Sequence, residues 1–140
     1  MEIKKVEGKT EEEVLKGLDI KDIHYEITEV PAKLFKSKKV ELKYIEKDEI
    51  KNYIKNYIDN VAKSLNKTIN VEIRENEVGY NIMLISEENS ILIGKDGKTL
   101  NSIQLLLHQA INNLTGFNIR INVDAANYKS NKERKLEREI

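Results

Sequence analysis

The feature that most constrains the fold is a run of apolar residues with helical spacing near the middle of the chain. These residues recur at i, i+3 and i+4 for four turns. The spacing predicts an amphipathic helix that begins near Asp48, a residue type suited to an N-cap. Its apolar positions are Ile50, Tyr53, Ile54, Tyr57, Ile58, Val61, Ala62 and Leu65. No other helix in the sequence is as clearly marked.

The pattern then changes from helical to alternating. Apolar and polar residues alternate over 69–74 and again over 80–84, which predicts two strands joined by a turn. Met83 and Ile85 lie on the second face of the returning strand. We therefore expect that strand to be covered on both sides.

A second long helix and a last strand complete this part of the chain. Gly116 is suited to the position just after the helix, and residues 117–123 alternate again. The predicted order from Asp48 is helix, strand, strand, short helix, long helix, strand. The apolar stripe of the second long helix contains Leu100, Ile103, Leu107, Ala110, Ile111 and Leu114.

The first 46 residues predict a separate small unit of strand, helix, strand and strand. Thr10 and Glu13 fit a capping box at the start of its helix, with the Glu13 carboxylate reaching back to the cap amide. A unit of this size has a thin core. We expect three parts: residues 1–46, residues 47–127, and a charged helical tail at 128–140. The tail helix is expected to pack against another surface.

Lysines crowd the loop after Pro31 in this first unit. A solvated loop is the favoured interpretation, and contact with phosphates or with a protein partner stays open. The lysines are Lys33, Lys36, Lys38 and Lys39.

Composition excludes several classes of function. The chain has no cysteine, so it holds no disulfide, thiolate zinc site or thiol nucleophile. No apolar run approaches the ~20 residues of a membrane span, and the N-terminus lacks a secretory signal. His24 and His108 have no acidic neighbours at metal-binding spacing. We expect a cytoplasmic protein, not an enzyme, with no cofactor, no metal and no direct membrane insertion.

The chemistry concentrates in the segment between the short and the long helix of the second unit. Two glycines three apart allow a ligand to approach the backbone closely, and the long helix directs its amides and positive dipole end at the same place. Two lysines and one aspartate give this segment a net charge of +1. This arrangement suits a phosphodiester backbone. The segment is Ile93, Gly94, Lys95, Asp96, Gly97, Lys98 and Thr99.

A nucleoside triphosphate site is the rival interpretation of the same residues. Gly97-Lys98-Thr99 matches the end of a Walker A loop, G-x-x-x-x-G-K-[ST]. That motif requires a glycine at position 92, where this chain has Leu92. The loop is too short to surround a triphosphate, so NTP hydrolysis is not expected.

The second unit resembles a K-homology (KH) domain. The family signature [IV]-I-G-x-x-G-x-x-[IL] reads Leu92-Ile93-Gly94-Lys95-Asp96-Gly97-Lys98-Thr99-Leu100 in this chain. The resemblance implies a type II KH domain, αββααβ, with helices on one face of a three-stranded sheet. It also implies that the GxxG loop clamps single-stranded nucleic acid. Arg120, with Asn122 and Asn127, lies on or just beyond the polar side of the last strand and is a further candidate for RNA binding.

A narrower resemblance extends over nearly the whole chain. The segment 6–10 followed by acidic residues, and Asp124-Ala125-Ala126-Asn127-Tyr128-Lys129, are similar to the bacterial Jag family (SpoIIIJ-associated proteins, KhpB or EloR). The resemblance implies an α+β protein: a small β-α-β-β Jag-N-like module followed by the type II KH domain. Two departures stand out: the loop around Phe35 has no glycine, and no arginine lies four residues before a histidine. The family's C-terminal Arg-x-x-x-His domain is therefore not expected in this chain, and the tail leads towards it.

The resemblance also implies partners. Jag-type proteins associate with a small stand-alone KH protein and are linked to cell-envelope growth and to the membrane insertase. We expect single-stranded RNA binding without catalysis, within a bacterial regulator of cell shape. The alternative is a protein-interaction scaffold that mainly pairs with another KH protein. The thin first unit and the short tail, with Leu136 and Ile140 on one face, favour a homodimer.

Overall fold

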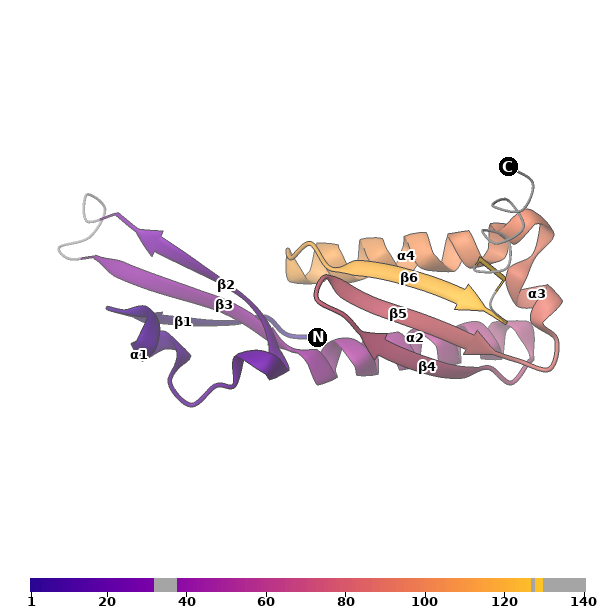
Figure 1. Ribbon diagram of the computed structural model, residues 1–140, viewed down its shortest axis with the longest axis horizontal. Helices are drawn as coiled ribbons and strands as arrows, with labels where there is room; N and C mark the ends of the chain where they lie inside the picture. Colours follow the sequence, from indigo (N-terminus) through magenta and orange to yellow (C-terminus); the bar gives the residue numbers. More distant parts are fainter. Residues whose placement is uncertain (32–37, 127, 130–140) are drawn as a thin grey trace. The chain divides into compact units, whose positions relative to one another are not determined.

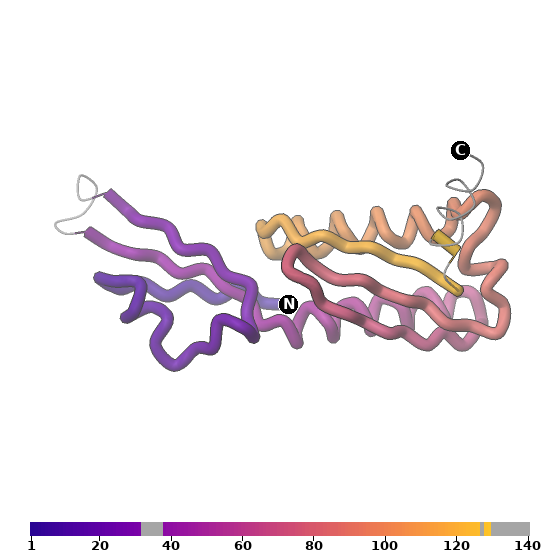
Figure 2. The backbone as a smooth tube through the Cα atoms, viewed as in Figure 1, coloured from indigo at the N-terminus to yellow at the C-terminus, as the bar shows by residue number. Residues whose placement is uncertain are grey.

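The computed structural model describes residues 1–31, 38–126 and 128–129, and is shown in Figures 1 and 2. It divides into two compact units, Met1–Tyr53 and Ile54–Ile140. The division falls within one long helix. The boundaries at 46/47 and 127/128 stay predictions.

The first unit is a three-stranded antiparallel sheet with one short helix. Its sheet order is β1-β3-β2, so β3 pairs with both neighbours. The predicted order of strand, helix, strand and strand is confirmed, with a 3-10 turn added before the second strand. The elements are β1 (Lys4–Gly8), α1 (Glu11–Leu15), η1 (Ile20–Asp22), β2 (Ile23–Val30) and β3 (Lys39–Glu46).

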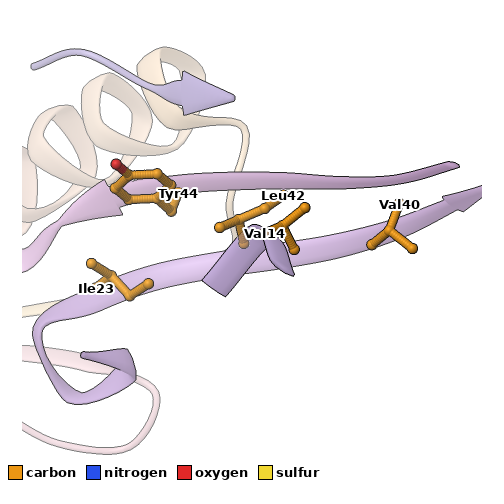
Figure 3. Packing of buried hydrophobic residues seen from close by; sticks show 5 residues of the cluster. All are labelled: Val14, Ile23, Val40, Leu42 and Tyr44. Carbon is orange, nitrogen blue, oxygen red and sulfur yellow. The ribbon is translucent and has the colours of Figure 1, made fainter. Parts of the chain in front are cut away.

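The core of this unit is small. Leu42 of β3 is fully buried, and Val14 of α1 packs close to it (Figure 3). Tyr25 of β2 is 42% exposed, although it alternates with the polar residues His24 and Glu26. The five buried residues of the cluster are Val14, Ile23, Val40, Leu42 and Tyr44.

The start of α1 differs from the expected capping box in one bond. The Thr10 hydroxyl accepts from the Glu13 amide at 3.2 Å, as predicted. The Glu13 carboxylate accepts from the Lys9 amide at 3.1 Å, one residue before the expected Thr10 amide. The cap therefore also holds the end of the preceding strand.

Half of the lysine-rich loop lies within the described residues. Lys38 is exposed, and Lys39 opens β3 with its amine 3.5 Å from the Glu7 carboxylate. Lys33 and Lys36 lie outside the described residues. The three interpretations of this loop stay open.

The second unit follows the predicted αββααβ order. β4 and β5 are antiparallel, β5 and β6 are parallel, and the sheet order is β4-β5-β6. The elements are α2 (Lys47–Leu65), β4 (Asn70–Glu75), β5 (Gly79–Ile85), α3 (Asn89–Ile93), η2 (Lys95–Gly97), α4 (Lys98–Thr115) and β6 (Arg120–Ala125).

One face of this sheet carries the core, and Figure 1 shows α2 and α4 on that side. Alternate strand residues point to it, as the period of two requires. Two apolar positions were predicted wrongly: Leu114 is 56% exposed and Ile85 is 49% exposed. The helices cover only one face of β5, so the second face is open at Ile85. Fully buried side chains on both layers include Ile54, Ile58, Ile82, Leu84, Leu107 and Ile111.

Close backbone approach explains the glycine that begins β5. Gly79 lies opposite Arg120, and a Cβ at Gly79 would collide with the Arg120 carbonyl group. The Asn76 side chain accepts from the Gly79 amide at 2.9 Å and closes the turn between β4 and β5. These contacts let β6 begin directly beside the hairpin.

The chain turns back on itself at the end of β6. Ala126 has a positive φ of 51°, and Tyr128 and Lys129 have helical backbone. Asn127 and residues 130–140, which hold most of the predicted tail helix, lie outside the described residues. None of the helices in the described ranges combines the length and apolar character needed to cross a bilayer.

Candidate nucleic-acid interface

The GxxG segment is held by the short helix before it. Leu92 of α3 is buried, and the Gly94 amide donates to the Ser90 carbonyl at 2.9 Å. The Asn89 side chain accepts from the Ser86 amide at 3.2 Å. These local bonds and one buried leucine hold the start of the loop, in which Lys95 and Asp96 are exposed.

The backbone of the segment requires both glycines. Gly94 has φ 70° and ψ −175°, a region that only glycine occupies readily. Gly97 has φ 77° and ψ 13°, which is left-handed. Asp96 is also left-handed, with φ 55°, a conformation that aspartate tolerates better than most residues. Positive φ angles at three of these four residues make a tight loop directly before α4.

The spaces beside the two glycines are filled by different neighbours. A Cβ at Gly94 would collide with the Thr99 hydroxyl. A Cβ at Gly97 would lie 3.0 Å from Cε1 of Tyr128. The loop is therefore closed on one side by its own helix and on another by the turn that follows β6.

The charged side chains of the loop point to solvent. Lys95, Asp96 and Lys98 are exposed, whereas Ile93 and Thr99 are partly buried and Gly97 is buried. The structure brings these predicted residues together in one loop. Gly97, the N-cap of α4, provides no side-chain cap for the amides of that helix. Two mobile cations thus flank a helix N-terminus, an arrangement that attracts phosphate.

Arg120 does not join this cluster. It is exposed at the start of β6, close to the C-terminal end of α4. Strand β6 runs back along α4, so its first residues lie near Asn112 and its last residues near the loop (Figure 1). From Lys98 to Asn112 the helix rises about 20 Å. Arg120 therefore lies far from the GxxG lysines.

Side-chain amides from α4 tie this helix to β6. The Asn112 side chain accepts from the Ile119 amide at 2.6 Å and donates to the Ile119 carbonyl at 2.9 Å. The Gln104 side chain accepts from the Val123 amide at 2.9 Å. These contacts were not predicted from the sequence, because a polar side chain on a helix does not reveal which strand it meets.

The contacts of the turn after β6 were not predicted from the sequence either. The Lys129 amine donates to the Gln104 side chain at 2.5 Å and to the Asn122 side chain at 3.5 Å. The Lys129 amide donates to the buried Asp124 carboxylate at 3.1 Å. The only sequence signal was the similarity of 124–129 to the Jag family.

The environment of Lys129 changes its ionisation. Burial lowers the pKa of the Lys129 amine from its ordinary value of 10.5, and the negative charge of Asp124 opposes this shift. Burial is the larger effect.

The described residues contain no group of three or more His, Cys, Asp or Glu placed to hold a metal ion.

The second unit matches a known family model. The model describes the KH domain of KhpA and KhpB, and it matches residues 47–123, which include the whole GxxG loop. Residues 1–46 lie outside the match, so their assignment as a Jag-N-like module stays a prediction.

A curated relative agrees with this match. RNA-binding protein KhpB of Clostridium symbiosum is 37% identical over 67 residues, which is 48% of this chain. The aligned part covers 30% of the relative, so the match spans less than a third of that protein's length. The sequence match and the αββααβ fold agree, and the chain belongs to the KhpA/KhpB KH-domain family.

Proposed function

We propose that this chain binds single-stranded RNA without catalysis, through the loop formed by Gly94, Lys95, Asp96, Gly97 and Lys98. The observation that carries the proposal is the conformation of this loop. Its reversed backbone exposes two lysines beside an N-terminus of α4 that has no side-chain cap. KH domains use such loops to hold the sugar-phosphate backbone of single strands.

The comparisons support this choice of ligand. The relative from Clostridium symbiosum is named an RNA-binding protein, and the family model that matches residues 47–123 describes a KH domain. From the Jag resemblance we also propose that the chain acts in the bacterial cytoplasm as part of a regulator of cell-envelope growth. Ile93 and Thr99 support the loop, and Arg120 would contact only a strand that runs along β6.

A titration with fluorescently labelled single-stranded RNA tests the proposal. Replacing Lys95 and Lys98 together by Asp reverses two charges, and we expect affinity to fall more than tenfold, or about 1.4 kcal/mol. Lys55→Asp with Lys63→Asp is the matched control, because both of these lysines are exposed on α2. Both variants should keep the circular dichroism spectrum of the unchanged chain. Equal binding by the loop variant and the control would contradict the proposal.

A second candidate function, pairing with another KH domain, is favoured by the surface of α4. Residues 99–119 contain no charged residue, although 34% of the chain is charged. Leu105 and Leu106 are 56% and 52% exposed on this helix. The cores of protein interfaces are depleted in charge in the same way. The partner we propose is a second KH domain, from another copy of this chain or from a small KH protein.

Sedimentation tests whether the chain pairs with another KH domain through α4. We expect the chain to form a dimer at high micromolar concentration, and Leu105→Glu with Leu106→Glu to return it to a 16.2 kDa species. Gln109→Glu with Asn113→Glu adds the same charge to exposed polar positions of α4 and serves as the control. A monomer at every concentration, with no binding to an added KH protein, would contradict this candidate.

A further inference from the structure

The turn after β6 places an aromatic ring against the GxxG loop. A Cβ at Gly97 would lie 3.0 Å from Cε1 and 3.7 Å from the hydroxyl oxygen of Tyr128. Gly97 is buried, and Tyr128 itself is only partly buried. The ring therefore covers the second glycine of the loop and still exposes part of its surface.

Several bonds fix the position of this ring. Asp124 is 6% exposed, and its carboxylate accepts from the Ala125 amide at 2.8 Å and from the Lys129 amide at 3.1 Å. Ala126 reverses the chain with its positive φ. The residue before the turn and the residue after the tyrosine are thus joined, so Tyr128 is held next to the loop.

The Lys129 side chain links the same turn to α4 and to β6. Its amine donates to Gln104 of α4 and to Asn122 of β6. The ring consequently lies where α4, the end of β6 and the GxxG loop meet. Figure 1 shows the end of β6 close to the start of α4.

We infer that Tyr128 is a nucleobase-binding residue, which stacks on one base of a single strand whose backbone is held by the loop. This inference rests on the proposed function. Bases of single-stranded RNA commonly stack on aromatic side chains, and such stacking tolerates different bases because each has a π-face. Along a strand every phosphate has a base close by, so a phosphate at Lys95 and Lys98 brings a base to the neighbouring ring.

Two substitutions distinguish stacking from simple packing. Tyr128→Phe keeps the aromatic ring, whereas Tyr128→Leu keeps apolar cover over Gly97 without a π-face. We expect Tyr128→Phe to bind labelled single-stranded RNA within about twofold of the unchanged chain and Tyr128→Leu to bind about tenfold more weakly. Tyr25→Leu is the control, because Tyr25 is an exposed tyrosine of the first unit.

A strand of the same length with abasic sites in place of bases gives the decisive comparison. We expect Tyr128→Leu and the unchanged chain to bind it equally, because no base remains to stack. The Lys95→Asp and Lys98→Asp variant should still bind it more weakly. An equal loss for Tyr128→Leu on both strands would show that the ring only supports the loop, and would overturn the inference.

A second measurement covers the case in which Tyr128→Leu does not fold. The chain has no tryptophan, so Tyr128→Trp introduces a single tryptophan beside Gly97, whose emission can be excited separately from that of the tyrosines. We expect its emission to be quenched by the base-containing strand and unchanged by the abasic strand. Equal emission with both strands, or tighter RNA binding by Tyr128→Leu because the ring blocks the site, would overturn the inference. If the unchanged chain binds no single strand, the proposed function itself fails.

Discussion

At the scale of single residues, the two glycines of the loop are required for different reasons. Gly94 has backbone angles that exclude other residues, and the Thr99 hydroxyl occupies the space of a side chain. Gly97 is left-handed and lies under the ring of Tyr128. The signature glycines thus reflect the shape of the loop and its neighbours as well as access for a ligand.

Gly94→Ala should therefore destabilise the fold more than an alanine at another glycine with positive φ. Gly17 is the matched control, because its φ is 81° and no atom lies within 4 Å of the added Cβ. We expect a loss of about 1–3 kcal/mol for Gly94→Ala, from backbone strain and the clash with Thr99, and a smaller loss for Gly17→Ala. Urea unfolding followed by circular dichroism measures both. Equal losses would mean that Thr99 does not confine Gly94.

Lys129 should make the free energy of unfolding depend on pH in the alkaline range. Since burial lowers its pKa below 10.5 in the folded chain, the unfolded chain binds more protons between the two pKa values. Stability from this residue should therefore rise with pH in that window and stay constant below it. The measurement is the free energy of unfolding of the unchanged chain minus that of Lys129→Met, taken from neutral to alkaline pH. A difference that falls as pH rises would contradict the burial of this amine.

At the scale of elements, α4 and β6 are joined by side-chain amides as well as by apolar packing. Asn112 bonds to both backbone groups of Ile119, and Gln104 bonds to the Val123 amide. In the described part of the chain, β6 is an edge strand of its sheet. Side chains of α4 therefore take the place of a neighbouring strand and keep the helix aligned with the sheet.

Asn112→Ala should be costly because it leaves the amide and carbonyl groups of Ile119 without this partner. We expect a loss of about 1–3 kcal/mol in the free energy of unfolding. Asn113→Ala removes the same group from the next, exposed position and should change stability by less than about 0.5 kcal/mol. Urea unfolding of the two variants is the measurement. Similar values for both would show that the bonds to Ile119 contribute little.

The elements themselves could be predicted because periods of 3.6 and 2 leave clear apolar patterns. Ile85 and Leu114 were assigned wrongly, since a pattern identifies a face but not what covers it. Arg120 was a further candidate because it lies on the polar side of the last strand, and strand direction places it at the end of α4 away from the loop. Tyr128 lies beside Gly97 only because Ala126 reverses the chain, and no local sequence signal marks an alanine with positive φ.

At the scale of the whole molecule, the balance of charge limits how the chain can bind RNA. It has 24 basic and 24 acidic side chains, so it has no general attraction for a polyanion. Binding should depend on the few cations of the loop and should be weak.

The salt dependence of binding measures the number of phosphates held. With two to four contacts, a plot of log affinity against log salt concentration should have a slope of roughly −1.5 to −3 for a single strand. Fluorescence titrations at several salt concentrations provide this slope. A much steeper slope would mean that further basic segments bind, such as the lysine-rich loop after Pro31 or the charged tail.

The most direct test of the central claim locates the RNA on the protein. Adding a short single-stranded RNA to isotope-labelled protein and following the backbone amide signals by NMR identifies the residues that sense the ligand. We predict the largest shifts for residues 93–99, with Tyr128 and Lys129 also affected and residues 1–46 unchanged. Shifts confined to residues 1–46 or to the open face of the β4-β5-β6 sheet, with the amides of Gly94 to Lys98 unmoved, would contradict the account.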